Sequence, residues 1–346
     1  MVLSIRGLVA AASVFAAIAG ACAQDRAPNA AHALSELKLS TALGPAYPQG
    51  KAGQVWAMLV RERSAGRLAV KHYPGATLFQ RDATREFAAL RDGSTAMAVG
   101  STLAWSSYVA EFNLIALPWL VPSGAALDAL LQSAVTARLA ARLEPLGIVV
   151  VAWASNGFRE IASKRPFRTP ADLAGMKVRT PGLALIDDTL VALGAVPVTM
   201  TAADARLAAL DGRLDAEETT TSAFRASRAA AAGFTHLQLW GAHADALVFG
   251  VNRRVWNAWS ADDRELVRQA AHEAAGEAIA LRRRLGGDAA LGEAVRQGAT
   301  VTRLTAAGKD AFRTATRPVY DRWAAVIGGE LVREAEAAVA AGEAPR

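Results

Sequence analysis

The sequence predicts an α/β fold built from two lobes. Strand patterns alternate with helix patterns along most of the 346 residues, which favours a mostly parallel sheet with helices on its faces. Hydrophobic residues make up 52% of the chain and charged residues 20%, a composition that supplies the cores of two domains. Because no internal repeat or low-complexity linker divides the chain, we expect the two lobes to exchange strands and to be joined by several crossings.

The first half of the chain begins with a strand, a turn and an amphipathic helix. The apolar run that precedes Asn156-Gly157 is continuous, as in a strand buried on both faces. The strands expected here are residues 37–43, 68–74, 95–101 and 147–155, and the helices are residues 49–64, 85–93 and 124–143.

A second α/β pattern starts after Asn156-Gly157. Thr169, Pro170 and Asp172 have the order of an N-cap, first and third helical position, which predicts a short helix ended by Gly175. The remaining expected strands are residues 158–163, 176–180, 196–200, a short strand within 214–224, and 244–252; the helices are residues 183–193, 201–211, a long helix at 260–284, and 305–325, followed by a frayed Ala/Glu-rich tail. The predicted lobes are residues 33–156 with 245–284 (lobe I) and residues 157–244 with 285–346 (lobe II).

Residues 1–23 have the pattern of a secretory signal peptide. Arg6 is followed by an uncharged apolar stretch that ends in small residues. The A-C-A sequence that ends this segment predicts cleavage before Gln24. The alternative is a weak lipobox, A-G-A-C, which would leave Cys22 as a lipidated N-terminus. Both interpretations predict a protein that is exported from the cytoplasm.

Charge and cysteine content exclude several classes of protein. Cys22 is the only cysteine, so a chain cleaved before Gln24 has no disulfide. Removal of residues 1–23 takes away Arg6 and changes the formal net charge from +6 to +5, with 37 basic and 32 acidic residues left. These basic residues are scattered and are not interleaved with aromatic residues, so no nucleic-acid partner is expected. No other apolar stretch is long enough to span a membrane, so any membrane partner is a separate chain.

The histidines do not form a metal-binding pattern. His272-Glu273 begins an H-E-x-x-H sequence, but Gly276 occupies the position of the second histidine. His236 and His243 are seven residues apart and have no cysteine nearby. We therefore expect neither a metal nor a cofactor.

Catalytic patterns are equally scarce. The sequence has no G-x-S-x-G nucleophile elbow, no Walker loop and no G-x-G-x-x-G after a strand. Asp215, Glu217 and Glu218 form one acidic group. This group is open to three interpretations: acid/base chemistry, stabilisation of a hinge, or pairing with an arginine.

Arg179 lies at the end of a strand and points away from its apolar side. Met176 and Val178 alternate with Lys177 and Arg179 before Thr180-Pro181-Gly182 ends the strand. Ligands of open α/β sheets bind beyond the carboxyl ends of the strands, so a guanidinium at this place is suited to an anion. A solvent-exposed surface charge is the alternative.

Two long segments carry a family resemblance. They are GIVVVAWASNGFREIASKRPFRTPADLAGMKVRTPG (147–182) and LGAVPVTMTAADARLAALDGRLDAEE (193–218), supported by GRLAVKHYPG, LRDGS, LPWL and VNRRVWNAWSADDRELV. Nearly the whole chain after residue 23 resembles the DctP-like solute-binding proteins of tripartite ATP-independent periplasmic (TRAP) transporters. The resemblance implies a two-lobed periplasmic binding protein clamshell that captures an organic acid and delivers it to TRAP membrane permease subunits. It also implies that Arg179 is the carboxylate-binding arginine and Arg159 a second ligand-binding arginine.

The sequence departs from the family at one segment of the expected site. The family commonly has D-G-Q-E-N-P where this chain has D-A-E-E-T-T, residues 215–220. Thr219 thus replaces an asparagine that contacts the ligand, and it offers a hydroxyl in place of an amide. Glu218, next to it, is also an expected ligand contact.

Four further residues complete the expected site. Ser101 and Trp105 lie in a loop that resembles a ligand-facing loop of the first lobe, where Trp105 is either a wall of the site or a core residue. Tyr47 lies in the first β-turn-α loop. His243 is either a ligand contact or a buried, hydrogen-bonded imidazole.

Three functions follow from these observations. The first is a monomeric periplasmic receptor for a small carboxylate that performs no chemistry. The second is a ligand-binding partner of a membrane sensor, and the third is an exported enzyme on the same scaffold. The sequence does not choose among keto acids, dicarboxylates, sugar acids and aromatic acids.

Overall fold

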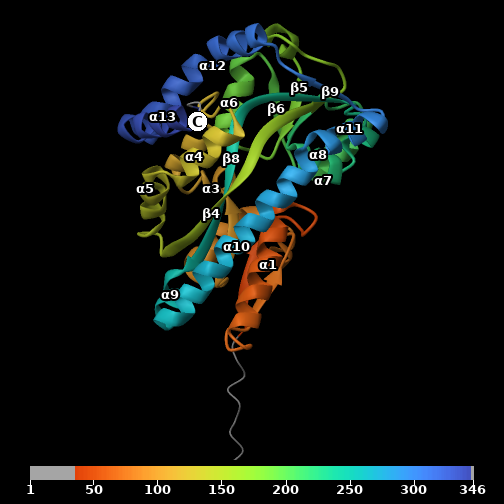
Figure 1. Ribbon diagram of the computed structural model, residues 1–346. Coiled ribbons are helices and arrows are strands. Elements are labelled where there is room, and N and C mark those ends of the chain that lie inside the picture. Colours follow the sequence, from red (N-terminus) through yellow and green to blue (C-terminus); the bar gives the residue numbers. More distant parts are fainter. Residues whose placement is uncertain (1–35, 344–346) are drawn as a thin grey trace, which may run out of the picture. The chain divides into compact units, whose positions relative to one another are not determined.

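The computed structural model describes residues 36–343 (Figure 1). The signal peptide predicted for residues 1–23, its cleavage before Gln24 and the alternative lipidation of Cys22 lie outside the described residues. Across residues 36–343, no helix has the length and apolar character needed to cross a bilayer.

The described chain alternates strands and helices throughout. The strands are β1 (Leu37–Thr41), β2 (Val70–Tyr73), β3 (Met97–Ser101), β4 (Ile148–Ser163), β5 (Lys177–Thr180), β6 (Val196–Thr199), β7 (Ala216–Thr219), β8 (His236–Asn252) and β9 (Thr300–Arg303). The α-helices are α1 (Pro48–Arg63), α2 (Glu86–Asp92), α3 (Thr102–Trp105), α4 (Gly124–Gln132), α5 (Ala134–Leu143), α6 (Ala184–Ala192), α7 (Ala202–Leu210), α8 (Thr221–Ala226), α9 (Arg253–Ala258), α10 (Ala261–Gly286), α11 (Asp288–Arg296), α12 (Ala306–Ile327) and α13 (Gly329–Glu343). Short 3-10 helices are η1 (Thr77–Phe79), η2 (Ala83–Arg85), η3 (Ala110–Ala116), η4 (Pro170–Leu173) and η5 (Ala229–Ala232).

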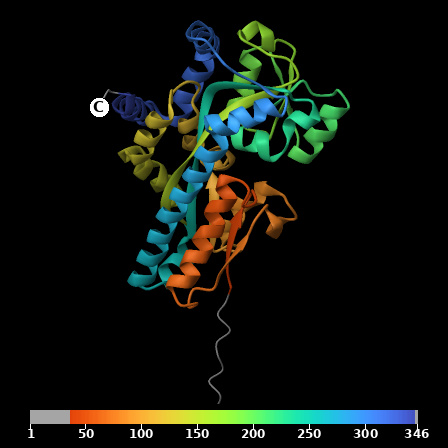
Figure 2. The ribbon, with the colours of Figure 1, turned by 45° about the vertical axis from the view of Figure 1, so that its right-hand side comes forward.

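All the strands belong to one mixed sheet. Its order is β2-β1-β3-β8-β4-β7-β5-β6, and β9 adds to β8. The pairs β3–β8, β4–β8 and β4–β7 are antiparallel, whereas the other pairs are parallel. The long strands β4 and β8 run side by side in both views (Figures 1 and 2). They therefore connect the β1–β3 end of the sheet to the β5–β7 end, as expected for lobes that exchange strands.

The predicted strand break at Asn156-Gly157 is wrong. β4 continues from Ile148 to Ser163, and its register with β8 shifts at a bulge between Ser155 and Gly157. Gly157 has φ +88°, a conformation that side chains other than glycine rarely adopt. The Asn-Gly pair thus bends one strand instead of ending it. The lobe boundary that we place there stays a prediction.

Three helical predictions also need correction. The helix expected at residues 124–143 is two helices, because Ser133 is extended and its hydroxyl accepts a hydrogen bond from the amide of Val135 at 3.2 Å. The short helix after Thr169 is a 3-10 helix, with the predicted capping box of Thr169 and Asp172. The Ala/Glu-rich tail is not frayed: in α13, Leu331 and Val339 are buried in the same core as residues of α4.

The helices α1 and α10 lie side by side on the sheet (Figures 1 and 2). Their interface buries Trp56 and Val267, and the Trp56 Nε1–H donates to the carbonyl oxygen of Val267 at 3.0 Å. As predicted, Ser260 caps the long helix by accepting from the amide of Asp263. This packing holds the first turn of α1, which borders the candidate site, against the β1–β3 end of the sheet.

The core contains carboxyl groups that favour folding at lower pH. Burial raises the pKa of Glu86, which accepts from the Ser40 hydroxyl at 2.9 Å, to about 8, and burial likewise raises the pKa of Glu160 to about 8. Because the folded chain holds these protons more tightly than the unfolded chain, their contribution to stability is lost as the pH rises to about 8. Burial lowers the pKa of His72 and His243 to about 4. These two histidines therefore make the folded chain more stable as the pH rises from about 4, and this gain in stability is complete near pH 6.5.

We therefore expect the Tm to fall between pH 6.5 and 8.5. Glu86→Gln, which stays neutral, should show a smaller fall. Calorimetry at several pH values checks both results, and a wild-type Tm that is constant or rises over this window would contradict the assignment.

Candidate functional site

A cavity of about 300 Å³ brings together most of the residues expected to bind a ligand. It lies where the start of α1 faces the strands β4, β5 and β7 and the helix α8. The expected site residues that line it are Tyr47, Arg159, Arg179, Glu218 and Thr219. The cavity is also lined by Gln49, Asn156, Arg206, Glu217, Ser222 and Phe234.

Arg179 is held in the cavity wall by its backbone and its side chain. It lies in β5 between Val198 of β6 and Glu217 of β7, which are its register partners. The Arg179 Nε–H donates to the carbonyl oxygen of Met200 at 2.9 Å. Within the described chain no carboxylate lies within ion-pair distance of Arg179. Burial lowers the pKa of its guanidinium, and Glu218 and Glu217 oppose this effect.

Arg159 forms a buried ion pair with Glu218. The Arg159 Nε–H and Nη2–H donate to the two carboxylate oxygens of Glu218, the second at 2.8 Å. The side chains are 17% and 1% exposed, respectively. Burial lowers the pKa of Arg159, but the carboxylate of Glu218 outweighs it and raises the pKa overall. Of the interpretations of the acidic group, pairing with an arginine thus applies to Glu218.

Glu217 and Tyr47 contribute a carboxyl group and a hydroxyl group to the cavity lining. Burial raises the pKa of Glu217 to about 7; Arg179 opposes this effect and Glu218 adds to it. Burial and the charge of Glu217 both raise the pKa of Tyr47. Within residues 36–343 neither the Glu217 carboxylate nor the Tyr47 hydroxyl forms a side-chain hydrogen bond. Both groups are therefore available to a ligand.

Thr219 lines the cavity but is nearly buried. It is 6% exposed, and its hydroxyl donates weakly to the carbonyl oxygen of Thr220 at 3.4 Å. The replacement of an amide by this hydroxyl leaves a shorter side chain at the end of β7. The adjoining Thr220 caps α8 by accepting from the amide of Ala223.

Ser101 contributes to a buried hydrogen-bond cluster behind the cavity. Its hydroxyl donates to both carboxylate oxygens of Asp245, at 2.8 and 2.9 Å. The same carboxylate accepts from the Thr102 hydroxyl at 3.0 Å and from the Asn156 Nδ2–H at 2.7 Å. Ser101 is not among the residues that line the cavity. Its expected contact with a ligand stays a prediction, and through Asp245 it is linked to Asn156, which lines the cavity.

Trp105 is a core residue and does not form a wall of the cavity. It is 2% exposed and packs edge to face against Phe87, with ring centroids 5.3 Å apart. Gly100 leaves room for the indole: a Cβ atom on Gly100 would lie 2.0 Å from it. The aromatic side chain thus fills the space above a glycine of β3, which agrees with the core interpretation of Trp105.

His243 is also buried and outside the cavity lining. It is fully buried, and its Nδ1 lies 2.7 Å from the carbonyl oxygen of Ala116. Burial lowers its pKa to about 4, so the ring is neutral at physiological pH. Its Nε2 has no partner within the described chain. His243 therefore fits the interpretation as a buried, hydrogen-bonded imidazole better than the interpretation as a ligand contact.

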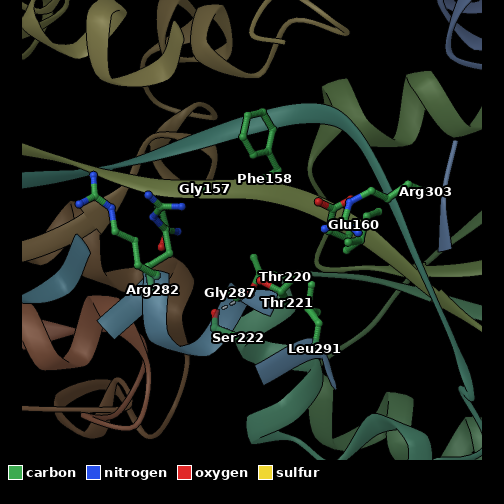
Figure 3. Close-up of a pocket in the computed structure, with 14 residues that line it drawn as sticks. Gly157, Phe158, Glu160, Thr220, Thr221, Ser222, Arg282, Gly287, Leu291 and Arg303 are labelled. Carbon is green, nitrogen blue, oxygen red and sulfur yellow. Dashed lines mark hydrogen bonds between the residues drawn. The ribbon is translucent and has the colours of Figure 1, made fainter. Parts of the chain in front are cut away.

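A second cavity, of about 370 Å³, adjoins the first. Asn156, Thr220 and Ser222 line both. Figure 3 shows Arg282 beside Gly157 and Arg303 beside Glu160 in this second cavity. Its arginines extend from the outer elements α10 and β9, whereas Arg179 and Arg159 belong to the first cavity. We therefore take the smaller cavity as the candidate site.

Sequence reasoning missed several lining residues. Gln49 is buried, and its Nε2–H donates to the carbonyl oxygen of Val99 at 2.7 Å, which fixes the loop of Tyr47 against β3. We interpreted Asn156 as the end of a strand, although an amide beside a bulge is a signal for a site. Phe234 lies outside every expected strand and helix, and Ser222 lies in the segment 214–224, for which we expect only a short strand. In the described residues 36–343, no group of three histidine, cysteine, aspartate or glutamate side chains could hold a metal ion.

Comparisons with known proteins agree with this architecture. The family model DctP, described as bacterial extracellular solute-binding protein, family 7, matches residues 39–326. A TRAP periplasmic solute-binding protein from Ralstonia eutropha H16, solved with bound (S)-2-acetolactate, is 46% identical; the match covers 88% of this chain and 99% of that one, with a TM-score of 0.85. The two-lobed clamshell fold predicted from the sequence is thereby confirmed.

Two sequence relatives are more distant. The C4-dicarboxylate-binding periplasmic protein DctP of Rhodobacter capsulatus is 27% identical over 88% of this chain and 91% of its own length. An uncharacterized protein, y4mM of Sinorhizobium fredii, is 33% identical, but the match spans 54% of this chain and only 35% of that protein. From the family match and the 46% identity we conclude that this chain belongs to bacterial extracellular solute-binding protein family 7, the DctP family of TRAP solute-binding proteins.

Proposed function

We propose that this chain is a periplasmic receptor that binds a small organic acid of the 2-acetolactate type and performs no chemistry on it. The observation that carries the proposal is the half-buried guanidinium of Arg179. Its Nε is held by the carbonyl oxygen of Met200, and its two terminal nitrogens have no ion-pair partner within the described chain. A guanidinium fixed in this way presents a planar fork to both oxygens of a carboxylate.

The dimensions of the cavity support a small ligand. Its volume of about 300 Å³ lies at the lower end of the range of small-molecule sites. The relative that is 46% identical was solved with (S)-2-acetolactate, a branched acid of five carbons. We infer that an acid of similar size, with one carboxylate at Arg179, is the ligand of this chain.

The mechanism follows from the elements that meet at the cavity. Tyr47 and Asn156 belong to the predicted lobe I, and Arg159, Arg179 and Glu218 belong to the predicted lobe II. A ligand that contacts both sets binds the closed arrangement more tightly than the open one, and this difference in affinity shifts the population toward the closed state.

The proposal also covers the export of the chain, its oligomeric state and the delivery of the acid. The chain is exported by residues 1–23 and cleaved before Gln24, with lipidation at Cys22 as the alternative. It acts as a monomer and delivers the acid to TRAP membrane permease subunits. Family membership and the 27% identity to a dicarboxylate-binding periplasmic protein support this role.

A thermal-shift panel of organic acids and their neutral methyl esters tests the proposal. A ligand at about 100 times its Kd adds roughly 2.7 kcal/mol to the stability of the folded chain, which a melting curve resolves. We expect small hydroxy or keto acids to raise the Tm and the matching esters to have no effect. Stabilisation by neutral compounds without any effect of the acids would contradict the proposal.

A further inference from the structure

Glu217 lies directly beside the arginine that we assign to the ligand. Arg179 and Glu217 are register partners in the parallel strands β5 and β7, and partners in neighbouring strands direct their side chains to the same side of the sheet. Both line the cavity. They do not form an ion pair within 4 Å, so a carboxylate of the ligand at Arg179 would lie close to a second, protein-borne carboxylate.

The charges in the cavity otherwise nearly cancel. Arg159 and Glu218 neutralise each other through their two hydrogen bonds. Arg179 and Glu217 carry opposite charges, and the remaining lining arginine, Arg206, is exposed. Arg179 thus neutralises the charge of one bound carboxylate only in part, because Glu217 already offsets part of its positive charge. A second carboxylate in a space of about 300 Å³ would lie near Glu217 without a buried counter-ion.

We propose that Glu217 is a specificity-determining residue that excludes dicarboxylates and selects monocarboxylates with a hydroxyl group next to the carboxylate. This inference rests on the proposed function of the site. An ionised Glu217 accepts hydrogen bonds and donates none, so it favours a ligand hydroxyl. Two like charges brought together in a poorly hydrated cavity repel each other strongly. Tyr47, which lines the same cavity, supplies a hydroxyl that can donate to the ligand.

Glu217→Gln tests this role, because it removes the charge and keeps the shape of the side chain. The probes are 2-hydroxy-2-methylbutanoate, a monocarboxylate, and 2-hydroxy-2-methylmalonate, which carries a second carboxylate on the same carbon. Calorimetry of the purified chain at pH 8 gives the ratio of their Kd values. Glu62→Gln, at the exposed far end of α1, is the matched control for loss of one negative charge.

We expect the wild-type chain to prefer the monocarboxylate by at least about tenfold. In Glu217→Gln this preference should shrink by about tenfold or more, mainly through tighter binding of the dicarboxylate, and in Glu62→Gln it should stay as in the wild type. If the ratio in Glu217→Gln remains within twofold of the wild-type ratio, the role of Glu217 is refuted.

A pH series on the wild-type chain provides a second measurement that does not depend on the variant. The charges that act on the pKa of Glu217 are those of Arg179 of β5 and Glu218 of β7. Tyr47, whose pKa Glu217 raises, and Arg159 of β4 line the same cavity. Because the pKa of Glu217 is about 7, a change from pH 8 to pH 6.5 protonates much of it. From pH 8 to pH 6.5, the preference for the monocarboxylate over the dicarboxylate should therefore decrease in the wild type and stay constant in Glu217→Gln.

The outcomes separate this inference from the proposed function. A wild-type chain that binds both acids equally at pH 8 contradicts the role of Glu217 and leaves the receptor function intact. A wild-type chain that binds no carboxylate contradicts both.

Discussion

Arg179→Ala should weaken the binding of the organic acid by about 30-fold or more and leave the unliganded fold intact. Truncation of one partner of a buried charge pair costs about 2–5 kcal/mol, which corresponds to this loss of affinity. The fold should tolerate the change, because the Arg179 side chain makes a single hydrogen bond within the described chain, to the carbonyl oxygen of Met200. Isothermal calorimetry of wild type and variant measures the loss, and circular dichroism checks the fold.

Two further variants test whether the geometry of the guanidinium matters and whether the effect is specific to residue 179. Arg179→Lys keeps the charge but cannot present two parallel N–H groups, so its affinity should lie between those of the wild type and the alanine variant. Lys177→Ala, two residues earlier in the same strand, is exposed and outside the cavity lining, and its affinity should equal that of the wild type. Retention of wild-type affinity in Arg179→Ala would contradict the assignment of the site.

Arg159→Ala should lower the free energy of unfolding by about 3–5 kcal/mol. The reason is the carboxylate of Glu218, which has only 1% of its side chain exposed and would lose the guanidinium that compensates its charge. Urea denaturation of the unliganded chain measures this change. The effect contrasts with that of Arg179→Ala, because Arg179 has no ion-pair partner to leave behind within the described residues.

The double variant Arg159→Met/Glu218→Leu tests why Arg159→Ala loses stability. The cause is either the loss of the ion pair itself or the buried charge of Glu218 that is left without a counter-ion. Replacement of both members by apolar side chains of similar size is often close to neutral for stability. We therefore expect it to recover most of the stability that Arg159→Ala loses. If the double variant is as unstable as the single variant, the pair stabilises the fold by a different route.

Local patterns were sufficient to predict most of the strands and the place of Arg179. The alternation in residues 176–180 and the break at Thr180-Pro181-Gly182 determine where β5 ends, and the structure has β5 from Lys177 to Thr180. The Asn156-Gly157 pair misled this reasoning, because the same residues suit a turn and a bulge. The pairing of β4 with β8 on both sides of Asn156-Gly157 shows that these residues form a bulge and not a turn.

The parts of the site that could not be predicted depend on contacts between distant segments. Arg159 and Glu218 are 59 residues apart in sequence, and nothing near either residue identifies the other as its partner. The burial of Trp105 depends on Gly100 and Phe87, which lie in other elements. The family resemblance predicts a ligand-facing loop at Ser101 and Trp105, but in this chain Trp105 is buried in the core and the Ser101 hydroxyl donates to Asp245.

A crystal structure of the complex with 2-hydroxy-2-methylbutanoate shows directly whether Arg179 holds the carboxylate of the ligand. We expect the ligand in the cavity between Tyr47 and Arg179, with its carboxylate oxygens about 2.7–3.0 Å from the guanidinium nitrogens of Arg179. A ligand bound in the neighbouring cavity beside Arg282, or one whose carboxylate contacts no part of Arg179, would contradict it.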